Sequence, residues 1–186
     1  SQYASGSVLG SGGLVFVWDG YLPAVGRRTL FATTGKFGVL DTNDSTVIDL
    51  GNSGVSRPIS PVVIGDFLYL PVAQKVYGGS RKASSYTTGT VTATNGSTTV
   101  TGSGTSWTAN LDAGMIVSIA NDATRFYVIA SVDSDTQITL TEPFLGTTGA
   151  GQSYTAAPFG TVSTRGGRAA DLYAVSAGRL LTLEGE

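Results

Sequence analysis

The chain contains no cysteine and no histidine. Without cysteine, the sequence can form neither a disulfide framework nor a reactive thiol. Without histidine, it lacks the side chain that most often serves as a general base and as a ligand for transition metals. These two absences weigh against enzymatic chemistry. The sequence predicts no catalytic residue, no cofactor and no metal.

Charge is also scarce. Only 13% of the 186 residues are charged, and the net charge is −2. The basic residues are scattered, so nothing in their distribution favours a nucleic acid as a partner. No apolar run approaches the roughly 20 residues that a membrane span requires, and the first residues lack the charged-then-apolar form of a signal peptide. We therefore expect neither nucleic acid nor membrane as a partner.

Glycine, threonine and valine are abundant instead. The sequence has 26 glycines, and the stretch 89–107, GTVTATNGSTTVTGSGTSW, alternates between small apolar residues and threonine. Residues branched at Cβ favour extended backbone, while glycine and asparagine favour turns. The composition therefore predicts an all-β protein, with enough apolar residues for a core.

Shifts in pattern divide the chain into three parts. Residues 1–13 are rich in small residues and predict a flexible N-terminal arm. Residues 14–84 together with 158–186 predict a β-meander domain. Residues 85–157 predict a small β-sandwich or barrel module inserted into that meander.

The meander is predicted from short apolar runs separated by turn residues. The expected strands lie at 14–20, 28–34, 37–42, 46–51, 61–72 and 74–79, with a tight turn at 42–45. Three fragments, at 29–42, 66–79 and 171–184, each read as strand, short turn and strand. Recurring units of this kind are typical of propeller blades or stacked meanders. They favour a blade-like, partly propeller-like meander, with an unrelated sandwich as the alternative.

The inserted module carries the clearer pattern. Its strands are expected at 89–95, 97–102, 115–120, 125–132, 136–141 and 153–157. The Asn95-Gly96 pair between two alternating runs predicts a hairpin. Val91, Ala93 and Val100 are predicted to face the core, with threonine on the outer face.

Two aromatic residues and one short segment complete this prediction. Trp107 and Tyr154 are expected to fill the core of the module rather than to bind a ligand. Residues 108–114 can form a single helical turn.

Within this module, short motifs follow one another in a recognisable order. They occupy Val100–Trp107, Ala113–Ile119, Phe126–Ile129, Ser134–Leu140, Pro143–Phe144 and Gly151–Tyr154. Each motif is weak alone, but the ordered series over 89–154 resembles a small β module found in virion proteins of tailed bacteriophages. Where that pattern often has Gly-Asp, this chain has Gly114-Met115, so any role of that acid is absent here.

The resemblance implies a structural role in the virion, in the tail or at the head–tail junction, after synthesis in the host cytoplasm. It implies other virion proteins as partners and a homo-oligomeric assembly, and it carries no catalytic residues. The outer segment 29–51 looks like blades of phage tail and connector proteins, a looser similarity. A capsid decoration protein or head fibre is one alternative.

A carbohydrate-binding adhesin module is the other alternative, with a host glycan as its partner. Its contact residues would be Trp18, Asp19 and Tyr21, which lie near the end of a predicted strand, where aromatic side chains can reach a partner or a sugar.

The acidic residues have no spacing that is typical of a metal or catalytic site. Asp133, Asp135 and Glu142 lie close together in the sequence, but a calcium loop would need further oxygen ligands at the right spacing. Residues 133–136 are better interpreted as a hairpin turn whose side chains bond nearby backbone amides. The scattered acids Asp19, Asp41, Asp66 and Asp171 show no spacing that supports a glycosidase pair.

Overall fold

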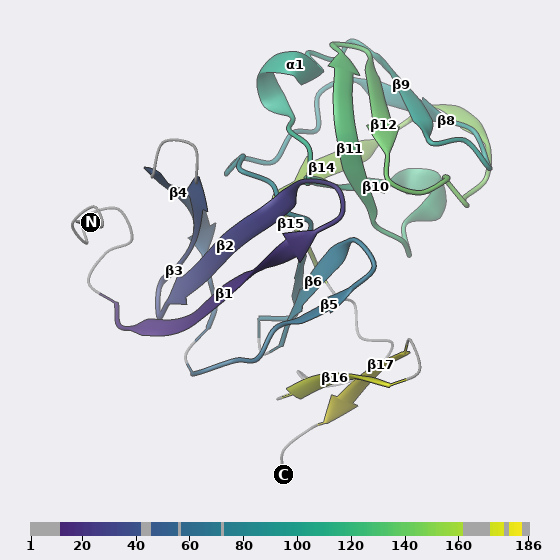
Figure 1. Ribbon diagram of the computed structural model, residues 1–186. Helices are drawn as coiled ribbons and strands as arrows, with labels where there is room; N and C mark the ends of the chain where they lie inside the picture. Colours follow the sequence, from purple (N-terminus) through teal and green to yellow (C-terminus); the bar gives the residue numbers. More distant parts are fainter. Residues whose placement is uncertain are drawn as a thin grey trace. The chain divides into compact units, whose positions relative to one another are not determined.

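The fold is all-β (Figure 1). The structure is a computed structural model that describes residues 12–41, 46–55, 57–71, 73–161, 172–176 and 179–183. The chain divides into two compact units, one of residues 1–76 and 161–186 and the other of residues 77–160. The second unit contains the whole of the range 85–157 and begins and ends slightly outside it.

The first unit contains an antiparallel sheet whose strands follow one another in space as in the sequence (Figure 1). Its strands are β1 (Leu14–Leu22), β2 (Gly26–Thr33), β3 (Lys36–Asp41) and β4 (Thr46–Asn52). A four-stranded up-and-down sheet is the architecture of a propeller blade. The predicted β-meander is therefore present in this sheet, and β1 and β4 form its two edges.

The side chains of β1 alternate between the two faces of the sheet. From Phe16 to Leu22, buried or half-buried residues alternate with exposed ones. Phe16 and Leu22 are buried, and the Phe16 ring meets the Phe37 ring of β3 edge-on, with 6.2 Å between centroids. Because successive side chains of a strand point to opposite faces, this period of two fixes which residues enter the core.

A second four-stranded sheet has the order β15-β7-β6-β5. Its strands are β5 (Val62–Ile64), β6 (Phe67–Leu70), β7 (Lys75–Tyr77) and β15 (Phe159–Thr161). The division between the two units falls within β7 and within β15. A separate hairpin joins β16 (Leu172–Ser176) to β17 (Arg179–Leu183). Each of the three repeated fragments thus contains two neighbouring strands.

The second unit is built on one curled sheet with the order β13-β8-β9-β12-β11-β10-β14 (Figure 1). The strands are β8 (Thr90–Ala93), β9 (Thr99–Ser103), β10 (Ile116–Ile119), β11 (Tyr127–Ser134), β12 (Gln137–Leu140), β13 (Gly149–Gln152) and β14 (Tyr154–Ala157). The prediction left a sandwich or a barrel open for the inserted module. Its single curled sheet has the form of a partial barrel.

One isolated bridge also pairs β14 with the segment that precedes β8. On one side β14 pairs with β10. On its other side Ala156 exchanges two backbone hydrogen bonds with Tyr86, of 2.8 and 3.0 Å. Tyr86 leads into β8, which itself pairs with β13. The bridge therefore brings the segment before β8 beside β14, while β13 remains at the other edge of the curled sheet.

The core of this unit lies inside the curled sheet. Its buried members are Val91, Ala93, Val100, Trp107, Leu111, Met115, Val117, Ile119, Tyr127, Ile129, Ile138, Leu140, Phe144, Tyr154 and Ala156. The threonines at 90, 92, 99 and 101 alternate with the core residues of β8 and β9 and are partly or fully exposed. The predicted inward position of Val91, Ala93 and Val100 is confirmed.

Trp107 lies at the start of the one-turn helix α1 (Trp107–Asn110), and its side chain is fully buried. Its Nε1 donates a hydrogen bond of 2.8 Å to Tyr154 Oη, and the two rings meet edge-on at 6.0 Å. Both residues therefore fill the core, as predicted. The helical turn expected within 108–114 is also present, although it begins one residue earlier.

The hairpin predicted from Asn95-Gly96 joins β8 to β9. Ser97 N donates to Thr94 O across the turn, and Gly96 has a φ of +83°, a conformation that favours glycine. The strands are paired only up to Ala93 and Val100. The connection is thus longer than the two residues of the shortest hairpins.

Three short elements were not predicted. They are β13, β15 and the 3-10 turn η1 (Ala120–Asp122). β13 has the sequence GAGQ, which contains no residue that favours strands, and its extended form follows from pairing with β8. The predicted turn at 42–45 and most of the predicted arm, residues 1–11, lie outside the described residues.

Candidate interaction surface

The exposed face of β1 carries an unusual number of apolar side chains. Leu14, Val17 and Tyr21 are 65%, 55% and 69% exposed. They lie on one nine-residue strand at the edge of its sheet, and among the described residues β1 pairs only with β2. Val17 and Tyr21 share one face by alternation, whereas Leu14 lies beyond a bulge between Leu14 and Phe16 that interrupts the alternation. A long edge strand with exposed apolar side chains presents unpaired backbone groups that another strand can join. We call Leu14, Val17, Asp19 and Tyr21, with the edge of β1 that pairs with no described strand, the β1 strip.

Asp19 is the acidic member of the strip, and its charge is balanced within the chain. Arg27 lies on β2 and binds both carboxylate oxygens, with a 3.0 Å hydrogen bond from Nε to Oδ1 and an ion pair from Nη2 to Oδ2. Thr29 Oγ1 donates to the same carboxylate at 3.0 Å. The hydrogen bond from Arg27 holds the pKa of Asp19 below its ordinary value. The strip is therefore apolar with a neutralised ion pair at its centre.

Trp18 lies on the opposite face of β1. It is half-buried, and its indole lies across Gly20, where a Cβ would come within 2.4 Å of the ring. Of the three residues predicted to contact a partner, Asp19 and Tyr21 therefore share one face and Trp18 does not. Trp18 and Tyr21 do not form one aromatic platform for a sugar ring.

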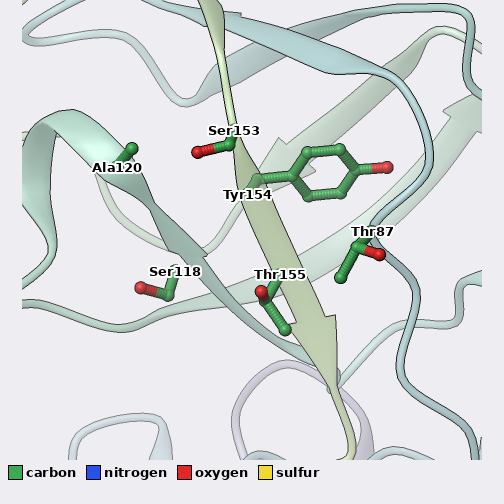
Figure 2. Close-up of a pocket in the computed structure, with 6 residues that line it drawn as sticks. All are labelled: Thr87, Ser118, Ala120, Ser153, Tyr154 and Thr155. Carbon is green, nitrogen blue, oxygen red and sulfur yellow. The ribbon is translucent and has the colours of Figure 1, made fainter.

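A hollow of about 330 Å³ lies on the outside of the second unit (Figure 2). Its lining is rich in hydroxyl groups and comes from Thr87, Ser118, Ala120, Ser153, Tyr154 and Thr155. Ser118 and Thr155 are directly opposite each other on β10 and β14. No charged side chain and no exposed aromatic ring lines this hollow, so it offers only neutral hydrogen-bonding groups.

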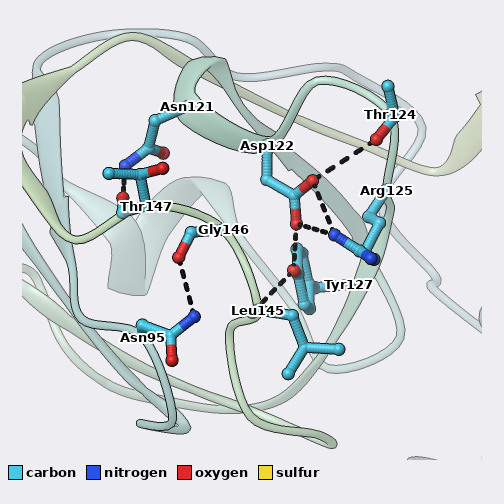
Figure 3. A network of polar contacts seen from close by, with 9 residues as sticks. All are labelled: Asn95, Asn121, Asp122, Thr124, Arg125, Tyr127, Leu145, Gly146 and Thr147. Atoms are coloured by element: carbon cyan, nitrogen blue, oxygen red, sulfur yellow. Dashed lines mark hydrogen bonds and ion pairs between the residues drawn. The ribbon is translucent and has the colours of Figure 1, made fainter.

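A polar network surrounds Asp122, the one charged residue found buried in the described part of the chain (Figure 3). Its carboxylate accepts hydrogen bonds from the Tyr127 hydroxyl and from Arg125 Nη1, the latter at 3.2 Å to each oxygen. The Tyr127 oxygen in turn accepts a hydrogen bond of 3.0 Å from Leu145 N. Burial, followed by the bond to Asp122, raises the pKa of Tyr127 to about 12.

The same network holds the loop that follows β12. Asn95 Nδ2 donates to Gly146 O at 3.0 Å, and Asn121 Nδ2 donates to Thr147 O. Asn95 from the β8–β9 connection, and Asn121 and Asp122 from the β10–β11 connection, therefore position this loop. A buried carboxylate with this set of partners serves packing and loop order, because its lone pairs are already used.

The acids at 133 and 135 lie at the tip of the β11–β12 hairpin, which confirms the predicted turn. Asp135 Oδ1 accepts a 3.0 Å hydrogen bond from Thr108 N in α1 and another from the Thr108 hydroxyl. Asp133 instead binds the side chains of Ser131, Gln137 and Thr139. The predicted bond to a nearby backbone amide is made by Ser134, whose Oγ accepts a hydrogen bond of 3.2 Å from Thr136 N. Asp135 instead binds a distant amide in α1, and Asp133 links the two strands through side chains.

Sequence reasoning missed two of these features. The Asp122 network was missed because Asp122, Arg125 and Tyr127, although neighbours in the sequence, hold a loop after β12 that is distant from them in the sequence. The β1 strip could have been found from the sequence, since strict alternation in VWDGYL places valine, aspartate and tyrosine on one face. The apolar side chains on the exposed face are the signal that was available.

Comparison with known proteins adds no relative. No protein-family model matches the sequence, no curated protein matches it, and no solved structure matches the fold. Within the described residues, no three acidic side chains gather in a way that could hold a metal ion. The helices of that part of the chain are too short to cross a membrane.

Proposed function

We propose that this chain is a non-enzymatic structural protein of a tailed-phage virion, in the tail or at the head–tail junction, and that it acts by subunit assembly. The assignment to a virion comes from the ordered motifs of residues 89–154. The assembly role is supported by the structure described above.

The observation that carries the assembly role is the β1 strip. Proteins that work as isolated monomers usually protect long edge strands with charge, proline or a covering segment. β1 instead exposes Leu14, Val17 and Tyr21, and its one acid is neutralised by Arg27. Such an edge suits a subunit that is completed by a neighbour.

The contacts of the acidic residues support a structural role over a catalytic one. Asp19 pairs with Arg27, Asp49 with Lys36, and Asp122 with Arg125 and Tyr127. Each of these acids links strands or orders a loop. A general acid or base would have to release such contacts before it could transfer a proton.

Quantitative mass spectrometry of purified phage particles from the source tests the proposal. Peptides of this chain should be present at a small fixed number of copies per particle, as expected for a ring of a tail or connector. Hundreds of copies would instead identify a capsid decoration protein. A chain absent from particles would overturn the virion assignment.

The adhesin alternative makes a different prediction. An adhesin would bind specific glycans on an array, and Tyr21→Ala would abolish that binding. Our proposal expects no glycan binding that depends on Tyr21, because the aromatic residues of β1 lie on opposite faces of the strand.

A further inference from the structure

We infer that β1 pairs with β1 of a second copy of this chain, in an antiparallel register centred on Trp18. This inference rests on the assembly role proposed above and names the partner of the β1 strip. The result would be one continuous eight-stranded sheet across a two-fold axis, a size that open sheets commonly reach.

The comparison between the two edges of the first sheet selects β1. At the other edge, β4 carries Asp49, which forms an ion pair with Lys36 of β3 and accepts a hydrogen bond of 2.8 Å from Gly51 N. Each edge strand thus carries one acid paired with a base of its neighbouring strand, so the ion pairs do not distinguish the two edges, and the exposed apolar side chains do. β1 places exposed Val17 and Tyr21 on either side of its one acid, so it is the less protected edge.

The charge of the strip permits a second copy as the partner. Two identical surfaces repel each other when they carry net charge, but Asp19 and Arg27 cancel within each copy. The whole chain has a net charge of only −2. A partner with a complementary charged surface would find no unbalanced charge on the strip to recognise.

The side-chain alternation of β1 restricts the register. A sheet extended across two copies must keep the buried face of one strand continuous with the buried face of the other. Within Phe16–Leu22, where the alternation is uninterrupted, even-numbered residues must therefore lie opposite even-numbered ones. An axis centred on a residue satisfies this condition, whereas an axis between two residues mixes the faces.

Charge and overlap then choose among the remaining registers. An axis at Asp19 would put Asp19 directly opposite its own copy, and like charges in that position are destabilising. An axis at Trp18 puts Val17 opposite Asp19 of the second copy and Phe16 opposite Gly20 of the second copy. It also overlaps the strands from Leu14 to Leu22, with regular alternation in the central pairs of Phe16–Gly20 and the bulge between Leu14 and Phe16 at each end. Every other register that keeps Asp19 away from Asp19 of the second copy overlaps fewer residues of β1.

This register predicts opposite effects for two charges at one position. In Val17→Asp, the new carboxylate lies opposite Asp19 of the second copy, twice by symmetry, so the dimer should dissociate about tenfold more readily or worse. In Val17→Lys, the ammonium lies opposite the same acid, so dimerisation should be retained. Val17 is 55% exposed, and both variants should therefore fold.

The experiment is sedimentation velocity of the full chain over a wide range of concentrations. The wild type should shift reversibly from the 19.0 kDa monomer to twice that mass. Val63→Asp is the matched control, because Val63 is 38% exposed on β5, another edge strand of the first unit. That control should dimerise like the wild type, and circular dichroism should show that all variants are folded.

Three outcomes would overturn the inference. A wild-type chain that remains monomeric rules out the β1 dimer. An assembly that tolerates Val17→Asp does not use this edge. Equal disruption by Val17→Asp and Val17→Lys would mean that the strip is buried against something other than Asp19 of a second copy. None of these results would affect the copy number measured in particles, so the proposed virion role is tested separately.

Discussion

At the scale of single residues, Tyr154 satisfies two buried groups with one hydroxyl. Its oxygen accepts a hydrogen bond from Trp107 Nε1 and donates one to Thr88 O, both at 2.8 Å. Burial raises the pKa of this tyrosine to about 12, so the hydroxyl stays protonated at neutral pH and can make both bonds. Tyr154 thereby connects α1, β14 and the segment before β8.

Removing that hydroxyl should destabilise the second unit. We expect Tyr154→Phe to lower the free energy of unfolding by about 1–3 kcal/mol, because it leaves the Trp107 N–H and the Thr88 carbonyl without their partner. Urea denaturation followed by fluorescence measures this change. Tyr86→Phe is the control, since Tyr86 is only half-buried; its hydroxyl accepts one hydrogen bond, from Ser106 N. An equal loss in both variants would contradict the assigned role of Tyr154.

Gly20 shows a different constraint, set by the indole of Trp18. A Cβ at position 20 would lie 2.4 Å from the ring. We expect Gly20→Ala to displace the ring and to cost about 1–3 kcal/mol, as overpacked positions do. The displaced Trp18 should shift the fluorescence emission to longer wavelength, because the other tryptophan remains buried.

Gly35→Ala is the matched control for this prediction. A Cβ at position 35 meets no atom within 4 Å, and the residue has no positive φ. Its free energy of unfolding should change by less than about 0.5 kcal/mol. An unshifted emission spectrum in Gly20→Ala would show that Trp18 does not occupy this space.

At the scale of elements, the β11–β12 hairpin depends on two ionised acids. Hydrogen bonds from Ser131 and Thr139 lower the pKa of Asp133, and those from Thr108 lower the pKa of Asp135. A carboxyl group with a lowered pKa in the folded state stabilises the fold above its ordinary value of 3.8. That contribution is lost as the pH falls through the lowered pKa.

We therefore expect the hairpin to loosen selectively in acid. Amide chemical shifts of residues 131–139 should begin to change as the pH falls below 3.8, before the core of the barrel responds. Asp133→Asn removes the ionised carboxylate that links β11 to β12. The corresponding changes in amide chemical shift should therefore already be present in this variant at neutral pH. Identical acid titrations in the wild type and the variant would refute the role given to Asp133.

The scale of elements also shows where sequence patterns are informative. β1, β8 and β9 alternate between apolar and polar residues, so their positions and their inward faces could be predicted. β13 has no such pattern, because glycine and alanine do not mark a face. Its strand conformation depends on β8, whose backbone lies beside it. Short strands of this kind are consequences of the fold around them.

At the scale of the whole molecule, the two units differ in which segments of the chain form them. Residues 77–160 form the second unit from one continuous segment, whereas the first unit uses residues from both ends of the chain. The continuous segment contains the complete buried core of the barrel. It therefore has what an independently folding domain requires.

We expect the fragment 77–160 to fold alone. It should show the circular dichroism of a β protein and a single cooperative transition in urea. The fragment 1–76 is the comparison, since it lacks the residues from 161 onward that belong to its unit. A fragment 77–160 without a cooperative transition would show that the barrel needs the rest of the chain.

The sequence by itself determined the all-β class, the β-meander and most of the strands, because glycine-rich turns and period-two alternation act over a few neighbouring residues. It also indicated that Trp107 and Tyr154 belong to a core. Strict alternation in the sequence already separates Trp18 from Tyr21, whereas only the tertiary structure decided that Arg27 neutralises Asp19. It alone joined Tyr86 to Ala156 and Asp122 to Tyr127 and the loop after β12. These features depend on strand register and on contacts between distant segments, which no local pattern of residues specifies.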